Sequence, residues 1–319
     1  NSLSSVRNYI FDITRRNIRR LDIPFYKTSC IRQVIQMKAK KRTARVLISV
    51  FLGFVVFILI ICLVLQIGYV ISKNNTTGLK PNYEMTDISE LLDKSNLDEN
   101  DYDILYRQTG LTKIGIDRAL SHGKEGKSKI LSIQKNFFKN QTLSSDLFAP
   151  FMGANYIKEH VTPVYLEDGD IVVTASTYLS FLKIGHAGLV TDGKNKKVLQ
   201  AVEYGSESKI GSIDDFTDRV NFMILSPKTP AEIKIEAARY AAKNLTGLPY
   251  SAFMGTNPTQ NEIKKTQCAH IVWFAYHASG YELFDKNKIL VMPYDLANSD
   301  KAEVVQVFGF DIDKLWDKM

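Results

Sequence analysis

The chain of 319 residues is 45% hydrophobic and 24% charged, a composition typical of folded proteins and not of disordered segments. Its formal net charge of +7 comes from one end: residues 1–45 hold twelve Lys or Arg and two Asp, a net +10 that leaves −3 for the remainder. The basic balance therefore does not indicate a nucleic-acid-binding surface, and no nucleic-acid partner is expected. We interpret residues 1–45 as a cytoplasmic basic arm that sets topology and attracts anionic lipid headgroups.

An uncharged apolar segment follows the arm. Residues 46–72 read VLISVFLGFVVFILIICLVLQIGYVIS, which exceeds the roughly 20 residues that a helix needs to cross a bilayer. Seven Lys or Arg lie in residues 27–45 and two in residues 73–92, and the richer flank is normally cytoplasmic. We therefore expect a single-pass protein of the cell membrane, with a cytoplasmic N-terminus and an extracytoplasmic C-terminal part.

Two regions are expected between the span and the main domain. Residues 73–95 are polar and contain Gly and Pro, which predicts a flexible stalk. Residues 96–160 show apolar residues at helical spacing, which predicts a helical lobe of two or three helices. Asn96 or Asp98 is expected to cap the first of these helices, and Gly110 to end it.

Residues 161–319 have the texture of an α+β domain. Short β-rich runs are bounded by turn residues: DGDIVVTAS, HAGLVTDGKNKKVLQAVEYG and NFMILSP. The segment TDGKNKK predicts a hairpin loop between two of these strands. Two helices are expected next, PAEIKIEAARYAAKNLTG and one beginning near Cys268, and EVVQVFGF is expected to be a closing strand.

Cys268 is the candidate nucleophile. Cys30 is expected to be cytoplasmic and Cys62 to lie in the span, so Cys268 has no partner for a disulfide in its own compartment. At the start of a helix, the backbone amides and the helix dipole stabilise a thiolate and lower the thiol pKa. The same amides, that of Ala269 among them, could hold an oxyanion. The alternative is that Cys268 is a small buried hydrophobe.

His186 is the candidate base among five histidines. It opens a strand in IGHAGLV, where Gly185 and Gly188 allow another backbone or a substrate to approach closely. Helical geometry points His270 and His277 away from a cysteine at the start of their own helix. The two other histidines, His122 and His160, lie in polar, loop-like surroundings.

Glu203 is the candidate residue that orients the base. Antiparallel partners have a nearly constant sum of residue numbers, so a turn centred near Lys194 or Asn195 places His186 opposite residues 202–204. Glu203 is the only carboxylate in that stretch, and it could stabilise an imidazolium. The alternative is a solvated strand carboxylate.

The order of these segments carries a resemblance. GDIV, GHAGLV, QAVEYG, GLPY, QCAHIVWFAY and MPYDLANS follow one another over about residues 165–310. This order resembles the permuted papain-like amidases of the YiiX/YaeF type, the circularly permuted branch of the NlpC-type cell-wall hydrolases. The resemblance implies a circularly permuted papain-like fold with an antiparallel sheet. By position it implies Cys268 as nucleophile, His186 as base, Glu203 as the third polar residue and Tyr250 as an oxyanion or substrate contact. Many relatives have Ser where this chain has Ala269, and this departure leaves the fine specificity open.

Together these features predict a membrane-anchored extracytoplasmic cysteine hydrolase, an amidase or peptidase that acts on cell-wall peptide. Two alternatives stay open: a lipid acyl hydrolase or transferase of the same fold, and a non-catalytic wall-binding module. We expect no metal and no other cofactor, because the sequence has neither a set of ligands at metal-binding spacing nor a phosphate-binding loop.

Overall fold

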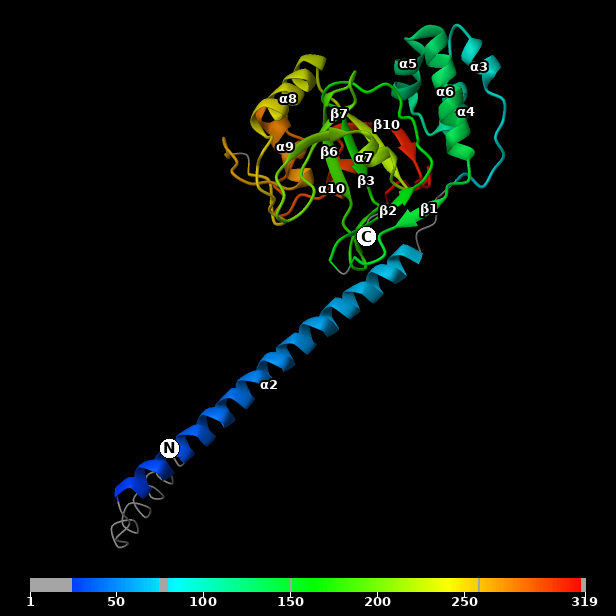
Figure 1. Cartoon of the computed structure of the whole chain (residues 1–319). Helices are drawn as coiled ribbons and strands as arrows, with labels where there is room; N and C mark the ends of the chain where they lie inside the picture. The colour runs from blue at the N-terminus through cyan, green and yellow to red at the C-terminus, as the bar shows by residue number, and fades with distance from the viewer. Residues whose placement is uncertain (1–24, 75–79, 150, 258, 317–319) are drawn as a thin grey trace. The chain divides into compact units, whose positions relative to one another are not determined.

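The computed structural model describes residues 25–74, 80–149, 151–257 and 259–316, so most of the predicted arm lies outside the described residues. Helix α2 runs over Phe25–Asn74. Its part Lys40–Asn74 is long and apolar enough to cross a membrane. The chain divides into two compact units, Asn1–Ile61 and Cys62–Met319, and the second contains every other described helix and strand (Figure 1).

The predicted helical lobe is present, and its helices are α3 (Ser89–Asp93), α4 (Glu99–Thr109), α5 (Lys113–Leu120) and α6 (Gly123–Phe138). Asp98 caps α4 and forms a capping box with Asp101, and Gly110 ends the helix with a φ of 72°. The predicted stalk is too long, because Ile88 and Leu92 are buried in the core of this lobe. Apolar side chains therefore hold the second half of the 73–95 segment against the helices.

A six-stranded sheet forms the centre of the domain, in the order β10-β9-β3-β6-β7-β8. The strands are β3 (Ile171–Thr174), β6 (His186–Asp192), β7 (Lys197–Gln200), β8 (Lys209–Ser212), β9 (Phe222–Pro227) and β10 (Ala302–Phe308). All neighbouring strands are antiparallel. The α+β prediction with an antiparallel sheet is confirmed, as are the hairpin β6–β7 and the strand β10.

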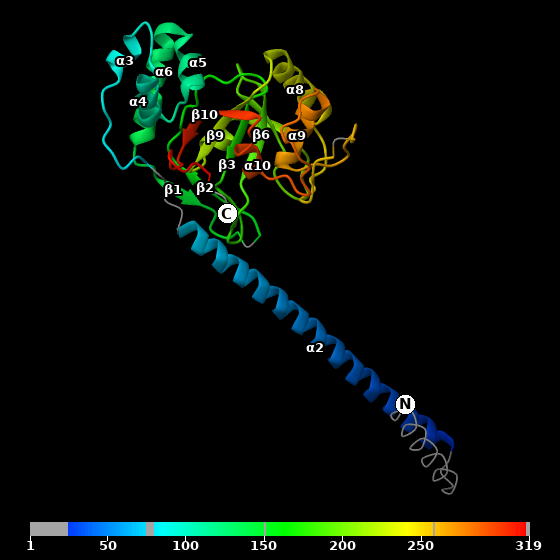
Figure 2. The same cartoon turned by 180° about the vertical axis from the view of Figure 1, so that it is seen from behind.

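Helices cover both faces of this sheet. Helices α8 (Ala231–Asn244) and α9 (Cys268–Ala278), with α10 (Pro293–Ala297), share one core with the side chains on one face. The short helix α7 (Asp214–Thr217) packs on the other face over β3, β6 and β7. The helical lobe shares a core with β9 and β10 (Figure 2). The start of α9 thus lies in the core, directly against the sheet.

A second, four-stranded sheet was not predicted. Its order is β1-β2-β4-β5, with β1 (Leu143–Ser145), β2 (Gly153–Ile157), β4 (Thr177–Leu179) and β5 (Leu182–Lys183). Two of these strands, β1 and β2, lie in the region 96–160, where we expected a lobe of two or three helices. The strands are two to five residues long, too short for a periodic pattern, and β2 finds its partner β4 more than twenty residues further along the chain.

Candidate active site

Cys268 is the first residue of α9, as predicted, and its side chain is almost fully buried at 7% exposure. The preceding residue, Gln267, has an extended backbone and caps the helix: its Oε1 accepts a hydrogen bond from the Ala269 amide at 2.9 Å. The Cys268 thiol donates to the same oxygen at 3.3 Å. The thiol proton is therefore held by the helix cap in the free protein.

Burial governs the ionisation of this thiol. Desolvation raises the pKa of Cys268 to about 11, although the backbone amides of Ala187, Ala269 and Cys268 itself act to lower it. The predicted effect of the helix start is present, but the predicted net direction is wrong, because loss of water outweighs the amides. At pH 7 the thiol is therefore protonated, so Cys268 needs a base to become a nucleophile.

His186 opens β6, where it pairs across the ladder with Thr174 and is 5% exposed. Its ring stacks on Phe216 with the centroids 5.1 Å apart. The next residue along the strand, Ala187, is the one whose amide acts on the Cys268 sulfur. The strand neighbour of His186, Ala187, thus reaches a thiol that lies 81 positions further along the chain. Neighbouring strand side chains point to opposite faces, so the His186 ring lies with Phe216 on the α7 face, whereas Cys268 lies in the core on the α9 face.

A chain of hydrogen bonds defines the protonation of His186. Asp215 Oδ2 accepts from Gln200 Nε2 at 2.5 Å, which turns Gln200 Oε1 toward the histidine. That oxygen lies 2.8 Å from His186 Nε2. An amide oxygen can only accept, so Nε2 carries the hydrogen and Nδ1 carries the lone pair. Burial lowers the pKa of His186 to about 4, so the ring is neutral at physiological pH.

Glu203 does not orient His186, and this prediction is wrong. The turn is centred as expected, since Val190 pairs with Val198. However, β7 ends at Gln200, and Glu203 lies exposed in the following loop, where its backbone bonds Ser206. Successive side chains of a strand alternate between faces, which puts residue 200 and not 203 on the face of His186. This period of two was the signal that could have identified Gln200.

Tyr250 lies beside the thiol, as the resemblance implied. It forms an isolated bridge with Thr266, two residues before Cys268. Burial, and secondarily Cys268, raises the pKa of Tyr250 to about 12, so its hydroxyl stays a donor. Ala269 departs from its predicted role, because its amide is already bonded to the Gln267 side chain.

The other histidines take no part in this arrangement. His270 is fully buried, with Nδ1 2.9 Å from Thr266 Oγ1, and burial lowers its pKa to about 4. His277 bonds Glu282, His160 bonds Asp218, and the ring of His122 stacks on Tyr165. Within the described ranges, no three His, Cys, Asp or Glu side chains are grouped so that they could hold a metal ion.

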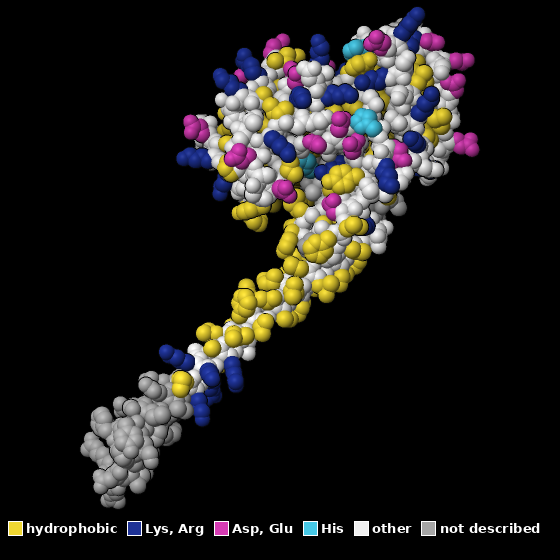
Figure 3. Space-filling view, viewed as in Figure 1, with side chains coloured by type: hydrophobic (Ala, Val, Ile, Leu, Met, Phe, Trp, Pro, Cys, Tyr) yellow, Lys and Arg dark blue, Asp and Glu magenta, His cyan; other side chains and the backbone are white. Residues whose placement is uncertain are grey.

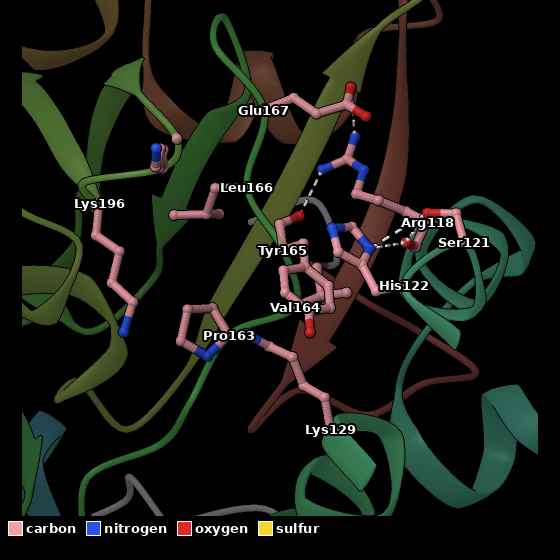
Figure 4. Close-up of a pocket in the computed structure, with 12 residues that line it drawn as sticks. Arg118, Ser121, His122, Lys129, Pro163, Val164, Tyr165, Leu166, Glu167 and Lys196 are labelled. Carbon is pink, nitrogen blue, oxygen red and sulfur yellow. Dashed lines mark hydrogen bonds and ion pairs between the residues drawn. The ribbon is translucent and has the colours of Figure 1, made fainter. Parts of the chain in front are cut away.

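A separate cavity of about 590 Å³ lies between the helical lobe and the β6–β7 turn (Figure 4). It is basic: Lys129 and Lys196 point into it, and burial together with the charge of Lys196 lowers the pKa of Lys129. Arg118 on its wall is neutralised by Asp170 and Glu167. None of Cys268, His186 and Gln200 lines this cavity, so it is not the space around the thiol.

No family model, curated protein or solved structure matches this chain.

Proposed function

We propose that this protein is a membrane-anchored cysteine hydrolase in which Cys268 is the nucleophile and His186 the general base. One observation carries the proposal: the Asp215–Gln200–His186 chain leaves Nδ1 unprotonated on a residue whose strand neighbour, Ala187, reaches a cysteine at a helix start. The proposal requires the His186 ring to turn from Phe216 toward the thiol during the reaction. A buried histidine with its tautomer held by a polar side chain is the arrangement that activates a thiol or hydroxyl in acyl transfer.

The reaction begins from a neutral pair, because the thiol pKa is about 11 and the histidine pKa about 4. His186 Nδ1 takes the thiol proton as the sulfur attacks the carbonyl carbon of an amide or ester. The Tyr250 hydroxyl and the Cys268 amide donate to the oxygen that becomes negative. The proton then passes to the leaving nitrogen or oxygen, the carbon–heteroatom bond breaks and a thioester remains. Water, deprotonated by His186, hydrolyses the thioester and restores the thiol.

Gln200 acts through His186 and is a positioning residue. When the ring becomes positive, its Nε2–H bond to Gln200 is strengthened, since hydrogen bonds to charged groups are worth about 1.5–3 kcal/mol. Asp215 supports this by holding the Gln200 amide in place.

We further propose that the domain is a circularly permuted papain-like fold. Support comes from the order of the elements, with the histidine strand β6 before the cysteine helix α9, and from the antiparallel sheet against which that helix packs. An amide side chain on the neighbouring strand completes the set. Gln200 thus takes the place that the resemblance implied for Glu203.

The proposed location is the outer face of the cell membrane, with α2 as the span and the N-terminus in the cytoplasm. The charge asymmetry of residues 27–45 and 73–92 supports this orientation. The proposed substrate is the peptide of the cell wall, through an amide bond. A lipid acyl ester is the second candidate, favoured by one observation: His186 follows two exposed apolar residues, Phe181 by five positions and Leu182 by four.

The test uses the full chain in lipid nanodiscs, incubated with purified peptidoglycan and with phospholipid. Release of peptides identifies the wall amidase, and release of fatty acid identifies the lipid hydrolase. Cys268→Ala and His186→Ala should each abolish the release, whereas His122→Ala, which alters an exposed histidine outside the site, should leave it unchanged. Binding of peptidoglycan without release of any product by the wild-type chain would show a binding module and overturn the hydrolase.

A further inference from the structure

Large apolar side chains are exposed at two ends of the four-stranded sheet, on the β1–β2 loop and at the β4–β5 loop with the first residue of β5. We call these five residues the apolar collar: Leu147 (91% exposed), Phe148 (72%), Phe151 (55%), Phe181 (64%) and Leu182 (45%). Hydrophobic side chains gather where the C-terminal end of α2 reaches the folded domain (Figure 3). Exposed apolar clusters of this kind normally mark a surface that is covered by a partner.

Both loops are bonded to the last turns of α2. Gln66 donates from Nε2 to the Leu147 carbonyl at 3.1 Å and accepts from the Ala149 amide at 2.8 Å. Ser180 Oγ donates to the Leu65 carbonyl at 2.9 Å. Ser72 Oγ donates to the Phe181 carbonyl at 3.1 Å. The collar therefore lies at the level of residues 65–72, which belong to the apolar segment.

The end of α2 also packs closely against the two loops, in addition to its hydrogen bonds with them. Tyr69 is fully buried in a cluster with Ala149 and Tyr178. A Cβ at Gly68 would stand 2.5 Å from Ser180 Oγ, so a larger residue there would displace the side chain that bonds the Leu65 carbonyl. The helix end and the two loops thus form one packed body within Cys62–Met319.

Gln66 shows why this contact suits a lipid environment. An amide side chain in an apolar span is costly unless both its oxygen and its nitrogen are bonded. The 147–149 backbone satisfies both groups, and Gln66 in turn satisfies an amide and a carbonyl of the loop. The reciprocal pair lets a loop with exposed side chains enter a region without water.

The depth follows from helix geometry. Gln66 lies eight residues before Asn74, the end of α2, which corresponds to about 12 Å along the helix axis. Half of a bilayer's hydrocarbon core is about 15 Å thick. If Asn74 lies at the polar boundary, residues 65–72 lie roughly 3 to 14 Å into the acyl chains, a range that includes the depth of about 5–10 Å typical of interfacial apolar segments.

We propose that the apolar collar inserts into the outer leaflet around the span, so that the domain is held on the bilayer by two loops in addition to α2. The partner is the acyl region of the lipid. This inference rests on the proposed membrane location of α2, and it does not depend on catalysis. It also places the strand that leads into His186 at the lipid surface, since Leu182 belongs to the collar and β5 ends three residues before β6 begins.

The experiment is quenching of tryptophan fluorescence by brominated phospholipid, on the full chain in nanodiscs. Phe148→Trp and Phe181→Trp report on the collar. Ile235→Trp, at an exposed position on α8, is the control outside it, and Phe57→Trp reports on the middle of the span. The native Trp273 and Trp316 are buried and supply a constant background.

We expect the tryptophans at 148 and 181 to lose emission, as at 57, while that at 235 is unchanged. Quenching at 57 without quenching at 148 and 181 would overturn the collar and leave the span in place. Absence of quenching at all four positions would overturn both. Hydrolysis by the same nanodiscs is measured separately, so failure of the collar and failure of the enzyme are distinguishable.

Discussion

Replacing Gln200 by leucine is the most direct test of the proposed base. The substitution keeps a side chain of similar volume but removes the oxygen that lies 2.8 Å from His186 Nε2 and the amide nitrogen that donates to Asp215. His186 then has no acceptor for Nε2–H when its ring becomes positive in the transition state. A hydrogen bond to a charged group is worth about 1.5–3 kcal/mol, which corresponds to a loss of roughly 10- to 150-fold in kcat.

The assay is steady-state hydrolysis by the full chain in nanodiscs, with kcat and KM measured separately. KM should change little, because Gln200 contacts the base and not the substrate. Gln200→Glu should recover part of the lost rate, since a carboxylate oxygen can also accept from Nε2.

The matched control is Gln134→Leu. Gln134 is another buried glutamine with two hydrogen bonds, to the Thr86 carbonyl and to Gln108, but it lies in the helical lobe. Both variants lose buried hydrogen bonds and should lose about 1–3 kcal/mol of stability. If Gln134→Leu slows hydrolysis as much as Gln200→Leu does, the effect of Gln200 is general destabilisation and the reasoning fails.

Three further outcomes are expected. Because the pKa of His186 is lowered to about 4, hydrolysis at pH 5–6 should stay near its value at pH 7 and decline only toward pH 4; a half-maximal rate near pH 6.5 would contradict a buried neutral base. The buried His270 also has its pKa lowered, from 6.5 to about 4, so as the pH falls the unfolded chain takes up this proton before the folded one. The free energy of unfolding should therefore decrease as the pH falls from about 6.5 to 4, and His270 should account for about 3 kcal/mol of this decrease. In urea unfolding experiments, the decrease for His270→Phe should be smaller by that amount. Gln66→Leu should leave the Leu147 carbonyl and the Ala149 amide without their partners. Losing these hydrogen bonds should lower the free energy of local opening by about 1–3 kcal/mol and speed hydrogen exchange of this loop by roughly 5- to 150-fold. Unchanged exchange would show that the two bonds do not stabilise the loop.

Features encoded over short stretches could be read from the sequence. Apolar spacing located α4, α5, α6, α8 and α9, turn residues located the β6–β7 hairpin, and Asp98 and Gly110 marked the ends of α4. An uninterrupted apolar run identified a helix able to cross a membrane. Each of these signals depends on the conformational preferences of neighbouring residues, which no distant contact needs to supply.

The tertiary structure decided what depends on burial and on partners far along the chain. The residue that bonds His186 is Gln200 and not the predicted Glu203, because β7 ends before Glu203 and the alternation of side chains along the strand puts residue 200 on the face of His186. The tertiary structure reversed the expected shift of the Cys268 pKa, because desolvation exceeds the effect of the helix amides. It also formed the four-stranded sheet and joined Gln66 to residues about 80 positions away. Burial from water and contacts between distant residues arise only when the chain is packed, so the pattern of neighbouring residues predicts neither of them.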